Sequence, residues 1–242
     1  MKKLTVAIFA LVLSVAATSA SAQTMQWTDK GYIGINGGVQ VGSDTLDTSS
    51  TFTQYGEPAS VTSTQKIKGG GFFDIGGAYR VWGNNLLAGV SFTHTSSDAS
   101  VAITASIPDP VVTDKPRAVS SSQSGAKHSE DALHLNAIWM IPVANKLDVG
   151  LFAGPTIFWV KQDTVGTPTV TEPGPTVSAP LGEIKKTSGG FNIGVDVQYM
   201  IAKRWGVGGL ARYTFGSASI EGATEKLKLG GFQIGGGARV RF

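Results

Sequence analysis

Two segments of the sequence carry the side chains best suited to chemistry, and the first is His94-Thr95-Ser96. Because His94 and Ser96 are two residues apart, they share one face if the segment is a β-strand. A serine hydroxyl needs an adjacent base before it can act as a nucleophile, and Asp98 is the nearest acidic side chain that could orient such a base. A histidine at a strand end, beside a Ser/Thr-rich loop, is the alternative. We favour that alternative and predict no catalytic residue.

The second segment holds His128, Glu130 and His134. Two histidines six residues apart can share a strand face, but with Glu130 they make only a loose metal constellation. The chain has no Cys, which excludes thiolate metal sites, disulfides and thiol nucleophiles. Its Gly runs lack the Lys-Ser/Thr of a phosphate-binding loop. We therefore predict no metal, nucleotide or other cofactor.

The composition limits both the fold and the partners. The chain has 242 residues, of which 41% are apolar, 15% are charged and 32 are Gly, so long helices are disfavoured. The pI is near 9.1, but Lys2 and Lys3 supply two of the 20 basic residues and leave 18 against 17 acidic ones. A nearly neutral remainder lacks the charge of a nucleic-acid binder. Lys2 and Lys3, an apolar run over residues 4–15 and Ala20-Ser21-Ala22 predict a cleaved secretory signal peptide over residues 1–22 and a mature domain over residues 23–242.

Eight segments beyond Lys30 alternate with period 2, which is typical of strands with one apolar face. The opposite face carries mainly Gly, Ala, Asn and Gln, whereas a soluble sheet shows Lys, Glu and Thr to water. Small inward residues fit a narrow eight-stranded barrel whose outer face meets lipid. We predict an all-β fold, an eight-stranded antiparallel up-and-down transmembrane β-barrel, with a secreted β-sandwich as the alternative. The segments cover residues 32–41, 72–81, 86–92, 133–141, 147–159, 191–199, 207–215 and 232–242.

The connections between these segments alternate between long and short. Residues 42–64, 96–127 and 163–183 are long and rich in Ser, Thr or Pro, whereas tight turns cover residues 82–85, 142–146 and 202–204. Long extracellular loops and short periplasmic turns are the plan of outer-membrane barrels. We therefore expect the long connections to be loops outside the cell.

Five ionisable side chains fall on the predicted inward face: Asp74, His134, Asp196, Arg212 and Arg239. Charges buried this deeply are tolerated only when they are paired or hydrated. We predict the ion pairs Asp74 with Arg212 and Asp196 with Arg239, which would plug the lumen. A narrow water path is the alternative, because five inward glycines leave room: Gly34, Gly76, Gly194, Gly208 and Gly235.

Six lysines precede the glycine-led starts of returning strands, so they should gather at the extracellular mouth. They are Lys66, Lys68, Lys185, Lys186, Lys226 and Lys228. Lipopolysaccharide phosphates are suitable counter-ions, since an ammonium group binds phosphate as a point charge. Ordinary solvated lysines are the alternative.

With these features the chain resembles the small outer-membrane β-barrel family that includes the OmpA transmembrane domain and the OmpX-like proteins. The resemblance covers about residues 27 to 242 and rests on the strand plan, the Gly-rich alternating segments and the terminal Arg239-Val240-Arg241-Phe242. It implies a Gram-negative outer membrane with lipid and lipopolysaccharide neighbours. It also implies that Phe242, Val240 and Ala238 form the signal read by the barrel-assembly machinery, after escort by periplasmic chaperones. The chain differs from full-length OmpA in ending at Phe242, so we expect no peptidoglycan-binding domain.

Members of this architecture serve as anchors, adhesins, narrow channels and occasionally enzymes. Eight-stranded lipid A deacylases use an exterior His-x-Ser pair and are similar at His94 and Ser96, but Ser97 stands where their pattern has Asn. We expect a non-enzymatic, structural or surface-interaction role through the extracellular loops, with an unknown partner. A narrow channel for small solutes is the alternative, and a lipid A-modifying hydrolase is a less favoured one.

Overall fold

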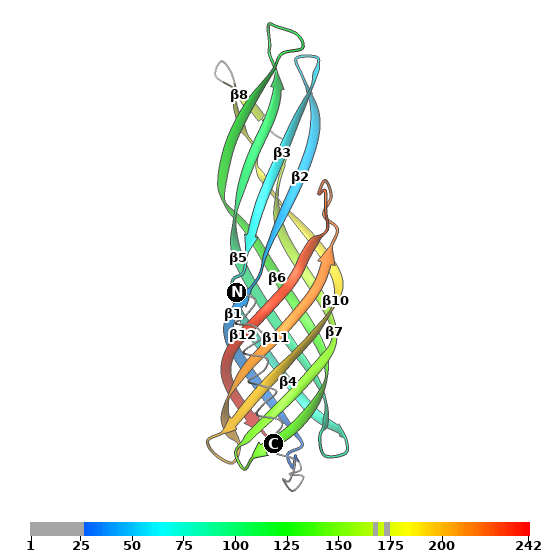
Figure 1. The fold of residues 1–242 in the computed structure, drawn as a ribbon, viewed down its shortest axis with the longest axis vertical. Coiled ribbons are helices and arrows are strands. Elements are labelled where there is room, and N and C mark those ends of the chain that lie inside the picture. The colour runs from blue at the N-terminus through cyan, green and yellow to red at the C-terminus, as the bar shows by residue number, and fades with distance from the viewer. Residues whose placement is uncertain (1–26, 167–168, 172–174) are drawn as a thin grey trace, which may run out of the picture.

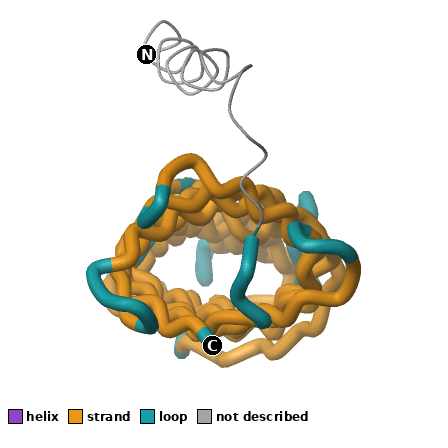
Figure 2. Tube along the Cα trace, turned by 90° about the horizontal axis from the view of Figure 1, so that it is seen from below, coloured by secondary structure: helices purple, strands orange, loops and turns teal. Residues whose placement is uncertain are grey.

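A computed structural model of the chain describes residues 27–166, 169–171 and 175–242. Eight strands close into one antiparallel ring, in which each strand pairs with its two neighbours (Figures 1 and 2). The predicted eight-stranded antiparallel barrel is confirmed, whereas the predicted signal peptide lies outside the described residues. Around the ring the order is β1 (Gly31–Val41), β4 (Gly71–Trp82), β5 (Leu86–Pro108), β6 (Pro116–Ala144), β7 (Leu147–Val165), β10 (Leu181–Met200), β11 (Trp205–Ala218) and β12 (Leu227–Arg241).

The first and last strands close the ring. Ten consecutive residue pairs, from Tyr32 opposite Arg241 to Val41 opposite Phe232, join β1 to β12. Beyond the strand end, the backbone N–H groups of Lys30 and Gly31 donate to the carbonyl of Phe242 at 2.7 and 3.1 Å. Closure pairs the backbone groups of both terminal strands, and a lipid-exposed sheet needs this because lipid offers no hydrogen-bond partner. Among the described residues, no helix is both long and apolar enough to cross a membrane.

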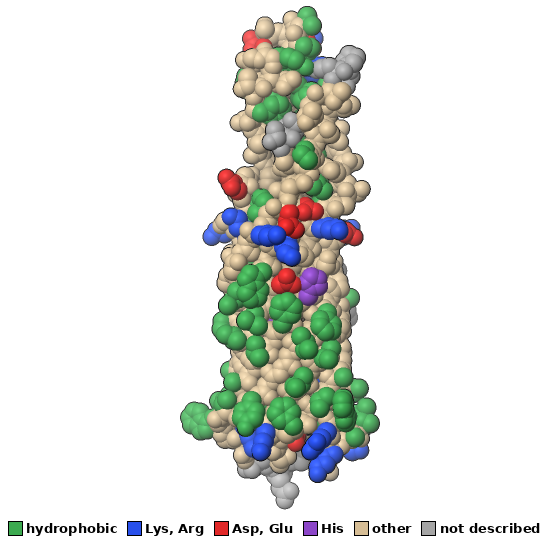
Figure 3. All heavy atoms as spheres, turned by 180° about the vertical axis from the view of Figure 1, so that it is seen from behind, with side chains coloured by type: hydrophobic (Ala, Val, Ile, Leu, Met, Phe, Trp, Pro, Cys, Tyr) green, Lys and Arg blue, Asp and Glu red, His purple; other side chains and the backbone are tan. Residues whose placement is uncertain are grey.

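On the face that Figure 3 shows, apolar side chains form a belt over the lower half of the molecule, and all eight strands of the ring carry exposed large apolar residues. Residues such as Ile35, Ile75 and Phe92 point outward and keep 46%, 42% and 39% of their surface exposed. Aromatic side chains stand beside the short turns, as Trp82 and Trp205 do. An exposed apolar surface this extensive is typical of contact with lipid rather than water.

Above this belt the structure differs from the sequence prediction. The stretches predicted as loops over residues 42–64 and 96–127 are largely strands, and the third stretch, residues 163–183, is partly so. A hairpin of β2 (Ser43–Gln54) and β3 (Glu57–Lys68) pairs with β5, and β5 and β6 continue upward far beyond the belt. A short hairpin of β8 (Thr169–Thr171) and β9 (Thr176–Ser178) completes this region. We call β2, β3, β8, β9, β5 from Ala99 onward and β6 up to Lys127 the extension.

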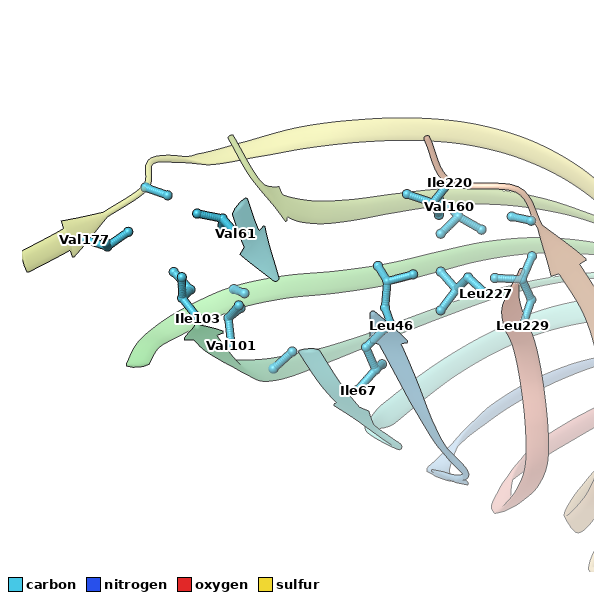
Figure 4. Packing of buried hydrophobic residues seen from close by; sticks show 14 of the residues in the cluster. Leu46, Val61, Ile67, Val101, Ile103, Val160, Val177, Ile220, Leu227 and Leu229 are labelled. Atoms are coloured by element: carbon cyan, nitrogen blue, oxygen red, sulfur yellow. The ribbon is translucent and has the colours of Figure 1, made fainter. Parts of the chain in front are cut away.

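The extension forms because these segments bury apolar side chains in one cluster, which they share with neighbouring parts of β7, β11 and β12 (Figure 4). Val101, Ile103 and Ile107 on β5 are at most 2% exposed, and Leu46 on β2 and Val61 on β3 pack in the same cluster. Burying a side chain such as Ile or Leu contributes about 1.5–3 kcal/mol. Five or more buried side chains of this kind can order strands that lie outside the membrane.

Strand β5 runs through both the belt and the extension, and its side chains alternate between inward and outward along its whole length. Along β5, Val90 and Phe92 point outward, whereas Val101 and Ile103 point inward. The phase of the apolar alternation is therefore inverted between Phe92 and Val101. The position of the inversion marks the upper edge of the belt.

Candidate functional site: the lumen, its upper junction and the outer rim

The centre of the lumen holds a buried ion pair. Arg212 Nη2 lies 3.1 Å from Asp74 Oδ2, and the two side chains are 1% and 5% exposed. Thr93 Oγ1 and Asn36 Nδ2 each donate to the Asp74 carboxylate at 2.8 Å, and Arg212 Nε donates to Gln233 Oε1 at 2.8 Å. The structure thus brings together the first predicted pair and surrounds it with hydrogen bonds, which is what makes a buried charge pair tolerable.

The second predicted pair is also present, nearer the short turns. Arg239 donates to both carboxylate oxygens of Asp196, and Gln198 Nε2 donates to Asp196 Oδ2 at 2.7 Å. The guanidinium lies against two glycines: a Cβ on Gly208 would fall 2.8 Å from Arg239 Cζ, and one on Gly34 would fall 3.2 Å from Arg239 Cδ. A larger residue at Gly208 would therefore displace the arginine.

The five inward glycines each adjoin other protein atoms. Gly34 and Gly208 adjoin Arg239, Gly76 adjoins Ser91, Gly194 adjoins Phe152 and Gly235 adjoins Phe72. Each of the five glycines thus makes room for a neighbouring side chain. A cavity of about 50 Å³ remains, lined by members of both ion pairs, and this volume suits a few ordered waters.

His134, the fifth predicted lumen residue, is fully buried. Its Nδ1 lies 2.8 Å from Thr156 Oγ1 and its Nε2 lies 3.1 Å from Thr93 Oγ1. Both ring nitrogens are thus engaged by hydroxyl groups, one of which also serves Asp74. His134 thus belongs to the lumen network. Among the described residues, no group of three or more His, Cys, Asp or Glu side chains is placed to hold a metal ion.

Arg241 is a lumen residue that the sequence analysis missed. Its Nη1 lies 2.6 Å from Asp148 Oδ2, it donates twice to Gln198 Oε1, and its guanidinium lies 4.3 Å from the Trp27 ring centroid. Arg241 is two residues from Arg239, so the alternation of β12 already predicted that it points inward. Asp148 and Trp27 became recognisable only through the packing of other chain segments.

A second buried cluster lies at the junction between the barrel and the extension. His128 Nε2 lies 3.0 Å from Glu130 Oε1, and His128 Nδ1 lies 2.7 Å from Gln162 Oε1. This cluster is level with Lys127, above the apolar belt. Burial lowers the pKa of His128, but the hydrogen bond and the charge of Glu130 outweigh burial and hold that pKa above its usual value.

The six predicted rim lysines are all exposed. On the face that Figure 3 shows, Lys and Arg side chains gather at the level where the apolar belt ends. Lys127 and Lys161 share this level and were missed by the sequence analysis; Lys161 stands opposite Lys185 in the β7–β10 ladder. Acidic neighbours are present as well. Lys185 Nζ lies 3.1 Å from Glu183 Oε1, and Lys228 Nζ lies 3.9 Å from Asp44 Oδ1. We call these eight lysines the lysine collar.

On the outer wall, the His-x-Ser segment has an acidic partner that sequence reasoning missed. His94 Nδ1 lies 2.6 Å from Asp131 Oδ1, and the two residues stand opposite each other in the β5–β6 ladder. The partner is therefore Asp131 rather than the predicted Asp98. Among the described residues, no hydrogen bond joins Ser96 to His94. The arrangement supplies a base and an orienting carboxylate, but no activated nucleophile.

At the chain end, Phe242 is 51% exposed and Ala238 also points outward, whereas Val240 is half-buried. Ala238 and Val240 pair with Ile35 and Ile33 across the closing ladder. These residues thus lie on the outer side of the last strand to pair.

Comparisons with known proteins point in one direction. A family model described as "Outer membrane protein beta-barrel domain" matches residues 8–241. Similar solved structures include Neisserial surface protein A (14% identity, 88% of this chain and 97% of that chain, TM-score 0.45) and OprG from Pseudomonas aeruginosa (12%, 90% and 99%, 0.48). The outer membrane protease OmpT from Escherichia coli is another (10%, 92% and 100%, 0.47). No curated protein sequence matches the chain.

Proposed function

The chain belongs to the family of outer membrane protein beta-barrel domains, and from this premise we propose that it is a surface-interaction protein whose extension is the contacting part. The observation that carries the proposal is the apolar core of the extension. A packed core holds the outward side chains in fixed positions, and fixed positions lower the entropic cost of binding a partner. In this proposal the extension faces outside the cell, as long connections do in this architecture.

The lumen supports an interaction role over a channel role. Two ion pairs and their hydrogen-bonded neighbours cross the interior, and the cavity that remains beside them is about 50 Å³. Water-filled porins need about 16 strands, twice the number found here. We therefore expect no steady conductance from the intact protein in planar bilayers.

The extension can be tested by comparing two variants on living cells. In the first, Pro58–Gln65 on β3 and their β2 partners are removed and a short turn joins the strands; in the second, only the tip residues Tyr55 and Gly56 are replaced by Asn-Gly. We expect the first to lose cell aggregation or attachment to immobilised glycans, while the second keeps it. Heat-modifiable migration in gels verifies that both barrels fold. Equal attachment by cells with the intact and the shortened extension would contradict the proposal.

We propose that lipopolysaccharide phosphates bind the lysine collar. On the face shown in Figure 3, Lys and Arg side chains gather at the upper edge of the belt, where the headgroups of the outer leaflet would lie, and exposed ammonium groups bind phosphate as point charges. Replacing all six predicted lysines by Gln should reduce the lipopolysaccharide that copurifies with the barrel. An unchanged amount would reject this part of the proposal.

For biogenesis, we propose that Phe242, Val240 and Ala238 engage the barrel-assembly machinery after periplasmic chaperones deliver a signal-peptide-cleaved chain. Phe242 is half exposed and its carbonyl closes the ring. Phe242→Ala should reduce the amount of assembled protein far more than the loss of one exposed ring would predict. Normal assembly of this variant in cells, judged by heat-modifiable migration, would contradict the proposal.

A second candidate function, lipid A hydrolysis, is favoured by one observation, the contact between His94 and Asp131. The contact leaves His94 Nε2 as a potential base on the lipid-facing wall. Overexpression should then reduce the number of acyl chains on lipid A, which mass spectrometry measures. Ser96→Ala and His94→Asn should each abolish the change. Unaltered lipid A would dismiss this candidate and leave the surface-interaction proposal in place.

A further inference from the structure

A cavity of about 230 Å³ crosses the wall of the barrel where β1 meets the extension. Its inner side is lined by inward residues that include Thr95, Ser97 and Glu130. Its outer side is lined by exposed residues that include Lys68 and Lys228. Because one cavity has linings from both faces, it connects the junction of the lumen with the outer surface at the level of the lysine collar.

The opening exists because the β1–β12 ladder stops at Val41 and Phe232. Beyond that pair, Gly230 and Gly231 have φ values of +84° and +137°, which residues with side chains rarely adopt. The Gly230 N–H turns inward to the Glu130 carboxylate at 3.1 Å, and its carbonyl accepts from Gln40 Nε2 at 3.0 Å. Higher up, the Asp44 side chain, rather than a strand backbone, accepts from the Lys228 N–H at 2.7 Å. The gap is thus built into the sequence of β12.

The lining indicates what the cavity can hold. Thr95, Ser97 and Thr214 supply hydroxyl groups, and Ser97 Oγ is buried without a hydrogen-bond partner. Gln40 and Glu130 also line the cavity, but their polar atoms are already engaged: Gln40 bonds to Thr95, Gln233, Glu130 and the Gly230 carbonyl, and Glu130 to His128 and the Gly230 N–H. The hydroxyl groups suit a ligand that is itself rich in hydroxyls.

The mouth carries two lysines and lies at a defined depth. Lys68 and Lys228 flank it and are both exposed, so their ammonium groups can reach a ligand. The Asp44 carboxylate also lines the cavity, 3.9 Å from Lys228 Nζ, so an anionic ligand must displace or share this contact. Tyr213 and Phe215, which also line the cavity, belong to the apolar belt and are 51% and 49% exposed. The mouth therefore lies at the boundary between the lipid tails and the headgroups.

We infer that this cavity is a binding site for a phosphorylated sugar, presented by a glycolipid headgroup of the outer leaflet. In this site the sugar hydroxyls bond to Ser97 and Thr95, and the phosphate lies between Lys68 and Lys228. The inference rests on the proposed binding of lipopolysaccharide at the collar and locates it at one place in the wall.

The test uses the full barrel in phosphatidylcholine vesicles, with and without rough lipopolysaccharide, and a calorimetric titration with glucosamine 6-phosphate. Ser97→Leu fills the cavity without changing charge, and Lys68→Gln with Lys228→Gln removes the phosphate partners. The matched controls are Ser121→Leu, also on the inner side of the wall but outside the cavity, and Lys161→Gln with Lys185→Gln, elsewhere in the collar. Ser97→Leu and the Lys68→Gln, Lys228→Gln variant should each lower the affinity for lipopolysaccharide about tenfold, while the two controls stay within about twofold.

The outcomes separate this inference from the proposal on which it rests. If both cavity variants lose affinity for lipopolysaccharide and also bind glucosamine 6-phosphate more weakly than the unchanged protein, the site binds the headgroup alone. If both lose affinity for lipopolysaccharide but the unchanged protein does not bind the soluble sugar, the site also needs the lipid. Equal losses in both lysine pairs and none in Ser97→Leu would overturn the cavity and leave the collar. No loss even when all six rim lysines are replaced would overturn both.

Discussion

The barrel within the belt and the extension above it are built from the same strands with opposite distributions of polarity. Within the belt, Asp74 and Arg212 are buried while Ile75 is exposed; in the extension, Ile103 is buried while Ser100 is exposed. The backbone alternation is common to both regions, so the surroundings rather than the secondary structure decide which face is apolar. The comparison shows that a single strand such as β5 can satisfy lipid and water in succession.

The two interiors are also stabilised differently. The lumen is held by directional contacts, such as those of Arg212 to Asp74, Thr93 and Gln233. The core of the extension is held by non-directional burial of aliphatic groups. We therefore expect the lumen to be sensitive to loss of one partner and the extension to be sensitive to loss of volume.

The largest effect should come from breaking the central ion pair. Arg212→Ala leaves the Asp74 carboxylate buried and unpaired, which costs about 3–5 kcal/mol in comparable sites. The free energy of unfolding of the barrel in lipid vesicles, followed by tryptophan fluorescence in urea, measures the loss. The double variant with Asp74→Ala should cost less than the two single variants added together. Strict additivity would show that the two side chains do not interact.

Planar-bilayer recordings of Arg212→Ala should also reveal a small conductance.

A core substitution in the extension should produce a somewhat smaller and local loss. Ile103→Ala removes a side chain that is 2% exposed, and such changes cost about 2–5 kcal/mol. Hydrogen exchange should accelerate in β3 and upper β5 while β10 and β11 stay protected. Thr104→Ala, on the outward side of the same strand, is the control and should have no effect. Faster exchange throughout the barrel would mean that the two regions unfold as one unit.

A lysine placed on the outer surface of each region should cost very different amounts of stability. Ile75→Lys puts an ammonium group in the lipid-facing belt, at a cost of about 2–4 kcal/mol near the middle of the membrane. Ser100→Lys puts it on the exposed face of the extension, where substitutions stay within about 0.5 kcal/mol. Urea titrations of both variants provide the measurement. Similar costs at the two positions would mean that the belt does not face lipid.

The smallest effect concerns the tip of the extension and its dependence on pH. The N–H groups of Val111 and Val112 donate to Asp109 Oδ1 at 2.9 and 3.1 Å, and these bonds lower the pKa of Asp109 below its usual 3.8. A lowered folded-state pKa stabilises the tip above pH 3.8, and this contribution is lost as the pH falls through the lowered value. Amide exchange at Val111 and Val112 should therefore increase in strong acid. Asp109→Asn should weaken the dependence on pH, whereas Asp114→Asn should retain it.

The belt and the lumen could be predicted from the sequence because large apolar residues alternate regularly with small or polar residues along their strands. Phe, Ile and Val opposite Gly, Asn and Asp specify which face is inward, and inward charges of opposite sign at similar heights predict their partners, as for Asp74 and Arg212. The sequence did not reveal the register between neighbouring strands. The register of β5 against β6 places His94 opposite Asp131, and no local pattern on β5 specifies this.

The extension was missed for two reasons. Its apolar residues alternate with small or weakly polar ones, and they occupy the inward positions, whereas the apolar residues of the belt occupy the outward positions. Val101, Ile103 and Ile107 alternate with Ala102, Thr104 and Ser106, and Ser and Thr are also common in loops. A search for apolar residues at every second position, allowing the phase to change, would have identified the strand. The wall cavity could not have been found this way, because its lining comes from seven strands, β1, β2, β3, β5, β6, β11 and β12, and depends on the backbone at Gly230 and Gly231 within β12.

The exposed face of the extension has a consequence for variation under selection. Ser100, Ala102 and Thr104 contribute nothing to the apolar core, and each projects into solvent. Replacing such residues changes stability by less than about 0.5 kcal/mol, whereas Val101 and Ile103 between them are fixed by packing. In the proposed orientation, with the extension outside the cell, antibodies would contact only this exposed face, so its chemistry could change while the scaffold that presents it stays the same.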